Sequence, residues 1–127
     1  MEPSCEDRAT VLTAVANALV RFHKQHYGRG PVRAHSHFAG PDALVCVLEN
    51  VLLPAERKLV AMGEHEIVHD SRRALTVATH DELTSTVELI VQRTVRAFAT
   101  TIDPRADIVF EHFLFEPQSS AAPRDDA

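Results

Sequence analysis

The sequence predicts an α+β domain in which helices pack on a four-stranded, mainly antiparallel sheet, in the order α-ββ-αα-ββ. Three observations predict this class. Apolar residues recur every three or four positions near the start and in the middle of the chain. Two pairs of apolar, alternating segments are each joined by a turn that contains proline. The length of 127 residues and the hydrophobic content of 45% suit one globular domain.

We expect this domain to occupy residues 7–117, between a flexible tail at 1–6 and a disordered tail at 118–127. The first helix is expected over 7–26, with an apolar face along the chain. Gly28 suits a left-handed helix cap, and Pro31 cannot continue a helix. The face consists of Leu12, Val15, Leu19, Phe22 and His26.

Two strands follow, over 32–38 and 43–49, and Gly40-Pro41-Asp42 between them indicates a hairpin. In the first strand, Arg33, His35 and His37 share one face. The second strand, ALVCVLE, is apolar on both faces, which predicts an interior strand covered on most of both sides.

A short helix is expected over 54–62, with Pro54 at a favoured first position and Gly63 at its end. A long helix over 64–92 follows, with a bend possible at His80-Asp81. The last strands, over 94–101 and 107–115, flank the turn Asp103-Pro104-Arg105. The buried stripe expected on the long helix is Val68, Leu75, Leu83, Val87 and Ile90.

The composition narrows the class of function. The net charge of −5 argues against a generic nucleic-acid-binding surface, so we expect no nucleic-acid partner. Cys5 and Cys46 do not form a disulfide framework and fit a reducing compartment. The polar N-terminus is no signal peptide, and no apolar run approaches the ~20 residues that span a bilayer. We therefore expect a soluble cytoplasmic protein without direct membrane insertion and without a cofactor.

The segment HKQHYGRGP, residues 23–31, and several later positions resemble the MpsC family. The family helix ends in a segment like HKxxYGKGP, which His23, Lys24, Tyr27, Gly28, Gly30 and Pro31 match. The similarity spans roughly residues 10–117. Further matching positions are Pro54, Ala55, Glu56, Leu59, Gly63, Val68, Arg72, Arg93, Val95, Ala97, Phe98, Asp107, Ile108 and Pro117.

The resemblance implies a soluble domain associated with a sodium-translocating, membrane-potential-generating system whose membrane components resemble inorganic-carbon uptake proteins. It implies an accessory or regulatory role and supplies no catalytic residues. The chain departs from the family at Leu53, where a threonine cap is usual, so a helix amide loses its side-chain acceptor. Residues 90–92 replace a Thr-Gly turn, so the long helix is expected to run further here.

The segment HEIVH, residues 65–69, is typical of zinc hydrolases. His65 and His69 lie one helical turn apart, and Glu66 could activate a zinc-bound water. The required third ligand could be His80, but a straight helix puts it about 16 Å beyond His69. Acidic residues in a first helical turn also interact favourably with the helix dipole. We therefore favour no metal site and keep this one as the alternative.

Four histidines, His23, His26, His35 and His37, fall within fifteen residues and could form a metal or pH-sensing site. The simpler interpretation is a polar sheet face with solvated imidazoles.

Positive charge coincides with the glycine turn after the first helix. A small anion or a partner could bind there with the help of glycine amides. The simpler interpretation is a tight turn with solvated cations. The candidate residues are Lys24, Tyr27, Gly28, Arg29, Gly30 and Arg33.

The function we expect is that of a non-enzymatic accessory domain that acts by binding a partner linked to a membrane transport system. We expect a homodimer, because a small sheet with an apolar edge needs covering, and a membrane transporter component as a possible further partner. The alternative is a zinc-dependent hydrolase that uses His65, Glu66, His69 and His80.

Overall fold

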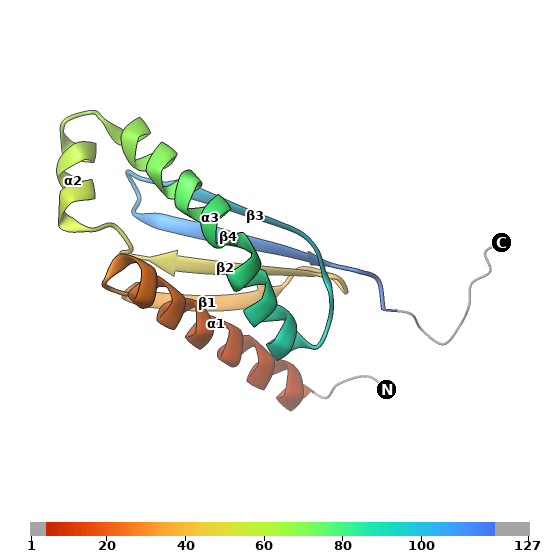
Figure 1. Ribbon diagram of the computed structural model, residues 1–127. Coiled ribbons are helices and arrows are strands. Elements are labelled where there is room, and N and C mark those ends of the chain that lie inside the picture. The colour runs from red at the N-terminus through yellow and green to blue at the C-terminus, as the bar shows by residue number, and fades with distance from the viewer. Residues whose placement is uncertain (1–4, 119–127) are drawn as a thin grey trace.

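The computed structural model describes residues 5–118 and shows three helices and one four-stranded sheet (Figure 1). The predicted class and the order α-ββ-αα-ββ are confirmed. Helix α1 begins two residues earlier than expected, and the rest of the expected tails, 1–4 and 119–127, lies outside the described residues. The elements are α1 (Cys5–Tyr27), β1 (Arg33–Phe38), β2 (Ala43–Glu49), α2 (Pro54–Ala61), α3 (His65–Val91), β3 (Val95–Asp103) and β4 (Ile108–Phe115).

The strands lie in the order β1-β2-β4-β3, and every neighbouring pair is antiparallel. Both hairpins form as expected, and β2 joins them by pairing with β4. The interior position predicted for β2 is therefore confirmed. Strand β3 carries an irregularity between Val95 and Ala97, next to the end of the sheet.

The core lies between one face of the sheet and the helices. Val15 and Leu19 of α1, Val87 of α3 and Phe113 of β4 are almost fully buried there. Burying an apolar side chain of this size contributes roughly 1.5–3 kcal/mol relative to exposure. The helical stripe predicted from the sequence is therefore the surface that packs against the sheet.

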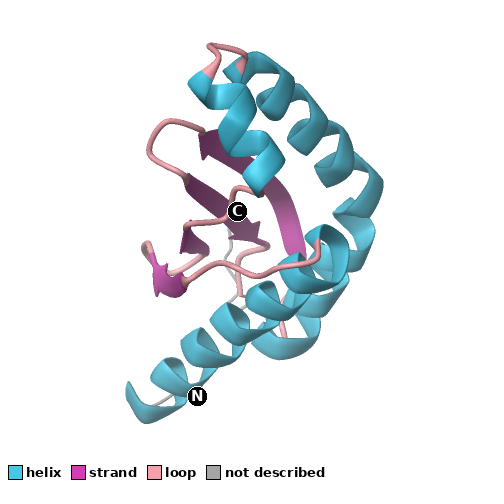
Figure 2. Cartoon of the chain, turned by 90° about the vertical axis from the view of Figure 1, so that its left-hand side faces the viewer, coloured by secondary structure: helices cyan, strands magenta, loops and turns pink. Residues whose placement is uncertain are grey.

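The opposite face of the sheet carries no helix within the described chain, and Figure 2 shows the helices gathered on one side. Val45 and Val47 of β2 point to this uncovered face and are partly exposed, whereas Leu44, Cys46 and Leu48 are buried. Only one face of β2 is thus covered by this chain, and not most of both faces as its apolar pattern suggested.

The helix ends follow the local sequence. Gly28 adopts a φ of 85° after α1, and its amide donates to the Lys24 carbonyl. Gly30 lies so close to α1 that a Cβ there would be 3.2 Å from Val20 atoms. Leu53 precedes α2 without a side-chain cap, and Glu56 instead accepts a hydrogen bond from the Leu53 amide at 2.8 Å.

Helix α3 runs without interruption through His80, so the bend considered there does not form. It also extends to Val91, as the replacement of the Thr-Gly turn predicted. Gln92 ends it in the left-handed conformation with a φ of 63°. No described helix is both long and apolar enough to cross a membrane.

Candidate functional site

A small pocket of about 50 Å³ lies between α1, α3 and the β3–β4 hairpin, and it is partly open to solvent. Eight of its ten lining residues carry polar or ionisable groups, although apolar atoms form most of the wall surface. Its lining residues are His23 and Tyr27 of α1, His69, Arg72, Arg73 and Thr76 of α3, Thr100 and Ile102 of β3, and Val109 and Glu111 of β4.

Glu111 is the buried acid of this pocket. It shares with Val109 and Phe113 the face of β4 that points to the helices. Its carboxyl therefore lies in the core. Only 4% of the residue is exposed. Thr100 donates a hydrogen bond to Oε2 at 3.2 Å, and Oε1 is buried without a partner. Burial raises the pKa of Glu111 to about 8.

His23 and Tyr27 enter the pocket from consecutive turns of α1, and their rings stack with centroids 5.4 Å apart. His23 Nδ1 lies 3.1 Å from the Leu19 carbonyl and donates to it. Burial lowers the pKa of His23 to about 4, so the ring is neutral at physiological pH. Burial also raises the pKa of Tyr27, which keeps its hydroxyl protonated.

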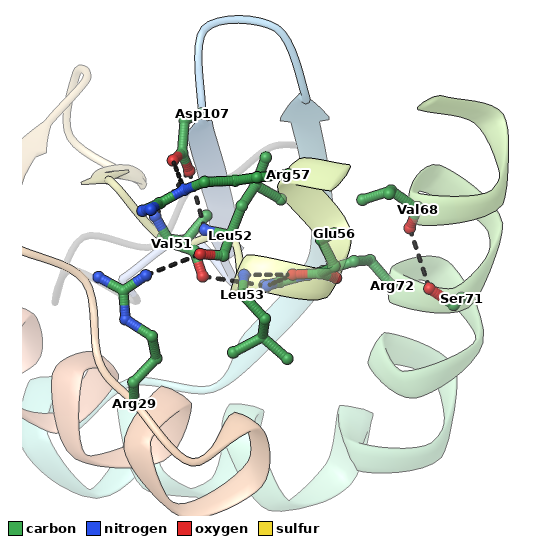
Figure 3. Close-up of polar contacts among 10 residues, drawn as sticks. All are labelled: Arg29, Val51, Leu52, Leu53, Glu56, Arg57, Val68, Ser71, Arg72 and Asp107. Carbon is green, nitrogen blue, oxygen red and sulfur yellow. Dashed lines mark hydrogen bonds and ion pairs between the residues drawn. The ribbon is translucent and has the colours of Figure 1, made fainter. Parts of the chain in front are cut away.

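Arg72 closes one side of the pocket and is held by a buried ion pair (Figure 3). Its guanidinium donates to both carboxylate oxygens of Glu56, at 2.6 and 2.8 Å, and to the Val51 carbonyl at 3.1 Å. Its Cζ also lies 4.0 Å from the centroid of the Tyr27 ring. Burial opposes ionisation of Glu56, but the hydrogen bonds from Arg72 and Leu53 prevail and lower its pKa.

The loop between β2 and α2 is fixed from several directions, as Figure 3 shows. Asp107 accepts hydrogen bonds from the amides of Val51 and Leu52, at 2.7 and 2.9 Å. Arg29 donates to the Leu52 carbonyl at 2.7 Å. With the Arg72–Val51 hydrogen bond, these contacts join the loop to α3, to the segment after α1 and to the β3–β4 turn.

The cluster suggested for an anion or partner is divided by the fold. Tyr27 faces the pocket, whereas the guanidinium of Arg29 is bound to the β2–α2 loop and the Gly28 amide to Lys24. Lys24 and Arg33 are exposed and do not line the pocket, and Gly30 is packed against α1. Anion binding by this cluster as a whole stays a prediction.

The histidines of the zinc motif lie on the first turns of α3, where His69 is exposed and lines the pocket. His80 lies further along the same uninterrupted helix, against Phe98, with its Nδ1 3.1 Å from Asp81. Among residues 5–118 no group of three or more His, Cys, Asp or Glu side chains is arranged to hold a metal ion.

The four histidines near the first turn are separated by the sheet. His23 is in the pocket, and His26 lies 3.2 Å from Glu82 of α3. His35 and His37 are on the uncovered face, where their ring nitrogens are 2.9 Å apart. The four imidazoles therefore do not converge on one site.

The sequence carried a signal for the buried acid, although Glu111 belongs to none of the motifs described above. Within IVFEHFLF, residues 108–115, Glu111 has the same parity as Val109, Phe113 and Phe115. A carboxyl in an inward-facing series is costly unless it has a function or a partner. The pairing of Arg72 with Glu56 across 16 residues had no such local signal.

The fold and pocket define a class, a two-layer α+β domain with one helical layer and a small pocket built around a buried carboxyl. The chain belongs to the MpsC family, because the family model described as "Na+-translocating membrane potential-generating system (MpsC)" matches residues 8–117. The resemblance noted from the sequence is thus confirmed. A search of curated proteins and a search of solved structures each found no match.

Proposed function

We propose that this protein is a non-enzymatic accessory component of a membrane-potential-generating system and that it acts by binding as a homodimer. Membership of the MpsC family supports the link to such a system. The observation that carries the binding role is the uncovered face of the sheet, which has apolar residues at its centre. Val47 of β2 and Phe110 of β4 are paired neighbours at the centre of this face and are only partly buried.

The strand register gives this face a symmetry that suits a second copy. One row of paired residues crosses the sheet as Arg33, Glu49, Ile108 and Asp103, and a later row as His35, Val47, Phe110 and Thr101. If the two sheets pack face to face about a two-fold axis parallel to the strands, β1 of one copy lies opposite β3 of the other, and β2 lies opposite β4. Arg33 then faces Asp103 of the second copy, and Val47 faces Phe110.

This arrangement replaces the reason first given for a dimer. The edge strands of the structure are β1 and β3, which carry arginine, histidine and threonine side chains. Such edges are protected against pairing. The face packing of two sheets about 10 Å apart would instead bury the apolar centre of both copies.

Sedimentation velocity of the wild type and of Phe110→Asp tests the dimer. We expect a dimer at about 100 µM for the wild type and a folded monomer for the variant, because a carboxylate at the centre of the face is costly to bury. Val77→Asp is the matched control, since Val77 is an exposed apolar residue of α3. A monomeric wild type, or a dimer unaffected by Phe110→Asp, contradicts the proposal.

Charge exchange tests the orientation. Arg33→Asp and Asp103→Arg should each weaken the dimer, and the double variant should recover part of the loss. Recovery in the double variant cannot come from local damage to either strand end. Equal weakening in all three variants argues against the two-fold axis parallel to the strands.

The link to transport is tested by co-expressing the protein with a membrane component of a membrane-potential-generating system. The wild type should co-purify with that component in detergent, and absence of the complex counts against an accessory role. The zinc-hydrolase interpretation is tested separately, by metal analysis of the protein purified without a tag. Stoichiometric zinc that is lost in His65→Ala would replace the proposal with that interpretation.

A further inference from the structure

The pocket over Glu111 is on the helical side of the sheet, opposite the face proposed for the dimer, so it needs a separate explanation. Its volume of about 50 Å³ exceeds the roughly 10–15 Å³ that one water requires. The space therefore suits a few waters or a ligand of three to five non-hydrogen atoms, by the same rough measure.

The unpartnered oxygen of Glu111 indicates that the pocket receives a polar ligand. Oε1 is buried and has no hydrogen-bond partner among the described residues, whereas Oε2 is engaged by Thr100. Leaving a buried oxygen without a hydrogen-bond partner is energetically costly. A ligand that shares a proton with Oε1 would remove this cost.

The charges around Glu111 decide the kind of ligand. The ionisable groups near it are His69, Arg72 and Arg73 of α3, His23 and Tyr27 of α1, and Cys46 of β2. Arg72 is neutralised by Glu56, and Tyr27 and the buried Cys46 are protonated near neutral pH because burial raises the pKa of each. Arg73 forms no ion pair with a described residue and is exposed at the rim. The rim therefore carries the positive charge of Arg73, and the floor carries the protonated carboxyl of Glu111.

We propose that this pocket binds a small monovalent carboxylate-class oxyanion. This anion accepts a hydrogen bond from the protonated Glu111 carboxyl and is neutralised at the rim by Arg73, beside the His69 ring. Thr76 and Thr100 also line the pocket, where their hydroxyls donate to the Arg72 carbonyl and to Glu111. A metal cation is the poorer occupant, because Arg72 and Arg73 line the pocket beside the single acid. Binding of the anion is coupled to retention of the Glu111 proton.

The test is a ¹H–¹⁵N chemical-shift titration of the full chain with sodium acetate, with sodium chloride at equal ionic strength as reference. A ligand of four non-hydrogen atoms has limited binding energy, so we expect a dissociation constant on the order of millimolar. The largest shifts are expected at Thr76, Thr100 and Glu111. Repeating the titration with the potassium salts identifies the binding ion.

Two variants and a control assign the site. Arg73→Gln should weaken acetate binding about fivefold, whereas Arg21→Gln, the same charge change at an exposed position of α1 outside the pocket, should not. Wild-type affinity should fall about tenfold per pH unit once Glu111 loses its proton. Glu111→Gln retains a hydrogen-bond donor and should lose this part of the pH dependence.

The difference between the pH slopes of the wild type and Glu111→Gln isolates Glu111, because His69, His23 and both arginines are the same in the two proteins. Saturable acetate binding with these differences supports the proposal. Absence of binding up to about 100 mM, which is far above the expected range, overturns it. So does equal affinity in Arg73→Gln, an unchanged slope in Glu111→Gln, or a response that follows sodium in place of acetate.

Discussion

The Thr100 hydroxyl donates to one carboxylate oxygen of Glu111 at 3.2 Å and leaves the other oxygen without a partner in the described structure. A single neutral donor offsets little of the cost of burying a charge. The acid therefore stays protonated to about pH 8 in the folded chain, whereas its ordinary pKa is 4.5. This difference connects the pocket to the stability of the whole domain.

The free energy of unfolding should decrease between about pH 6.5 and pH 8. Over this range the folded chain holds the Glu111 proton that the unfolded chain has released, so rising pH favours unfolding. His23 acts in the opposite direction at lower pH, because its pKa falls from 6.5 to about 4 on folding. Above 6.5 only the Glu111 effect remains, and it amounts to about 2 kcal/mol.

Urea denaturation at the two pH values measures this change. Glu111→Gln should remove the decrease and should be more stable than the wild type near pH 8. Glu116→Gln is the matched control, because Glu116 is exposed just beyond the same strand. Parallel pH profiles for the wild type and Glu111→Gln would show that the acid is already ionised in the folded protein.

Substitution of Asp107, a partly buried residue of the β3–β4 turn, should destabilise the fold strongly. Asp107→Ala leaves the Val51 and Leu52 amides without acceptors and places alanine at a φ of 60°, so we expect a loss of about 3 kcal/mol. Asp107→Asn keeps an oxygen and tolerates that φ, and should cost about 1 kcal/mol. Thermal and urea unfolding of both variants give the two values.

The neighbouring acid Asp103 provides the comparison. It accepts one hydrogen bond from the Ala106 amide in an exposed turn, so Asp103→Ala should cost less than about 1 kcal/mol. Equal losses at 103 and 107 would mean that the β2–α2 loop does not depend on the Asp107 carboxylate.

Cys46 should be protected from alkylation in the folded protein. It is fully buried on β2 opposite Glu111, and burial raises its pKa to about 12, so the reactive thiolate is scarce. Iodoacetamide labelling of a Cys5→Ser variant, followed by mass spectrometry along a urea series, reports on Cys46 alone. Labelling should rise together with global unfolding, and rapid labelling without urea contradicts the burial.

The fold could be predicted from local patterns, whereas the pocket could not. The buried face of α1 that includes Leu19 follows from a helical period, and the interior position of β2 follows from its continuous apolar run. The pocket depends on α1, α3 and the closing hairpin meeting around Glu111. No spacing in the sequence reports which segments meet.

Composition also could not tell which charges are free. Arg29, Arg72 and Arg73 look alike as residues, but the fold binds Arg29 to a backbone carbonyl and Arg72 to Glu56. Arg73 is exposed beside the pocket. The predicted anion cluster relied on charge near a glycine turn, and only Tyr27 from that cluster reaches the pocket that we now propose for an anion.

The end of α3 offers a test of backbone strain. Gln92 occupies a left-handed conformation with a φ of 63°, where a side chain costs about 1 kcal/mol or more. Gln92→Gly should therefore stabilise the protein by about 0.5–1 kcal/mol, the gain being reduced by the loss of the 2.6 Å hydrogen bond from its side chain to Leu89. Gln118→Gly, outside any helix or strand, is the control for composition. Urea unfolding gives the difference, and destabilisation by Gln92→Gly would show that the side-chain hydrogen bond outweighs the strain.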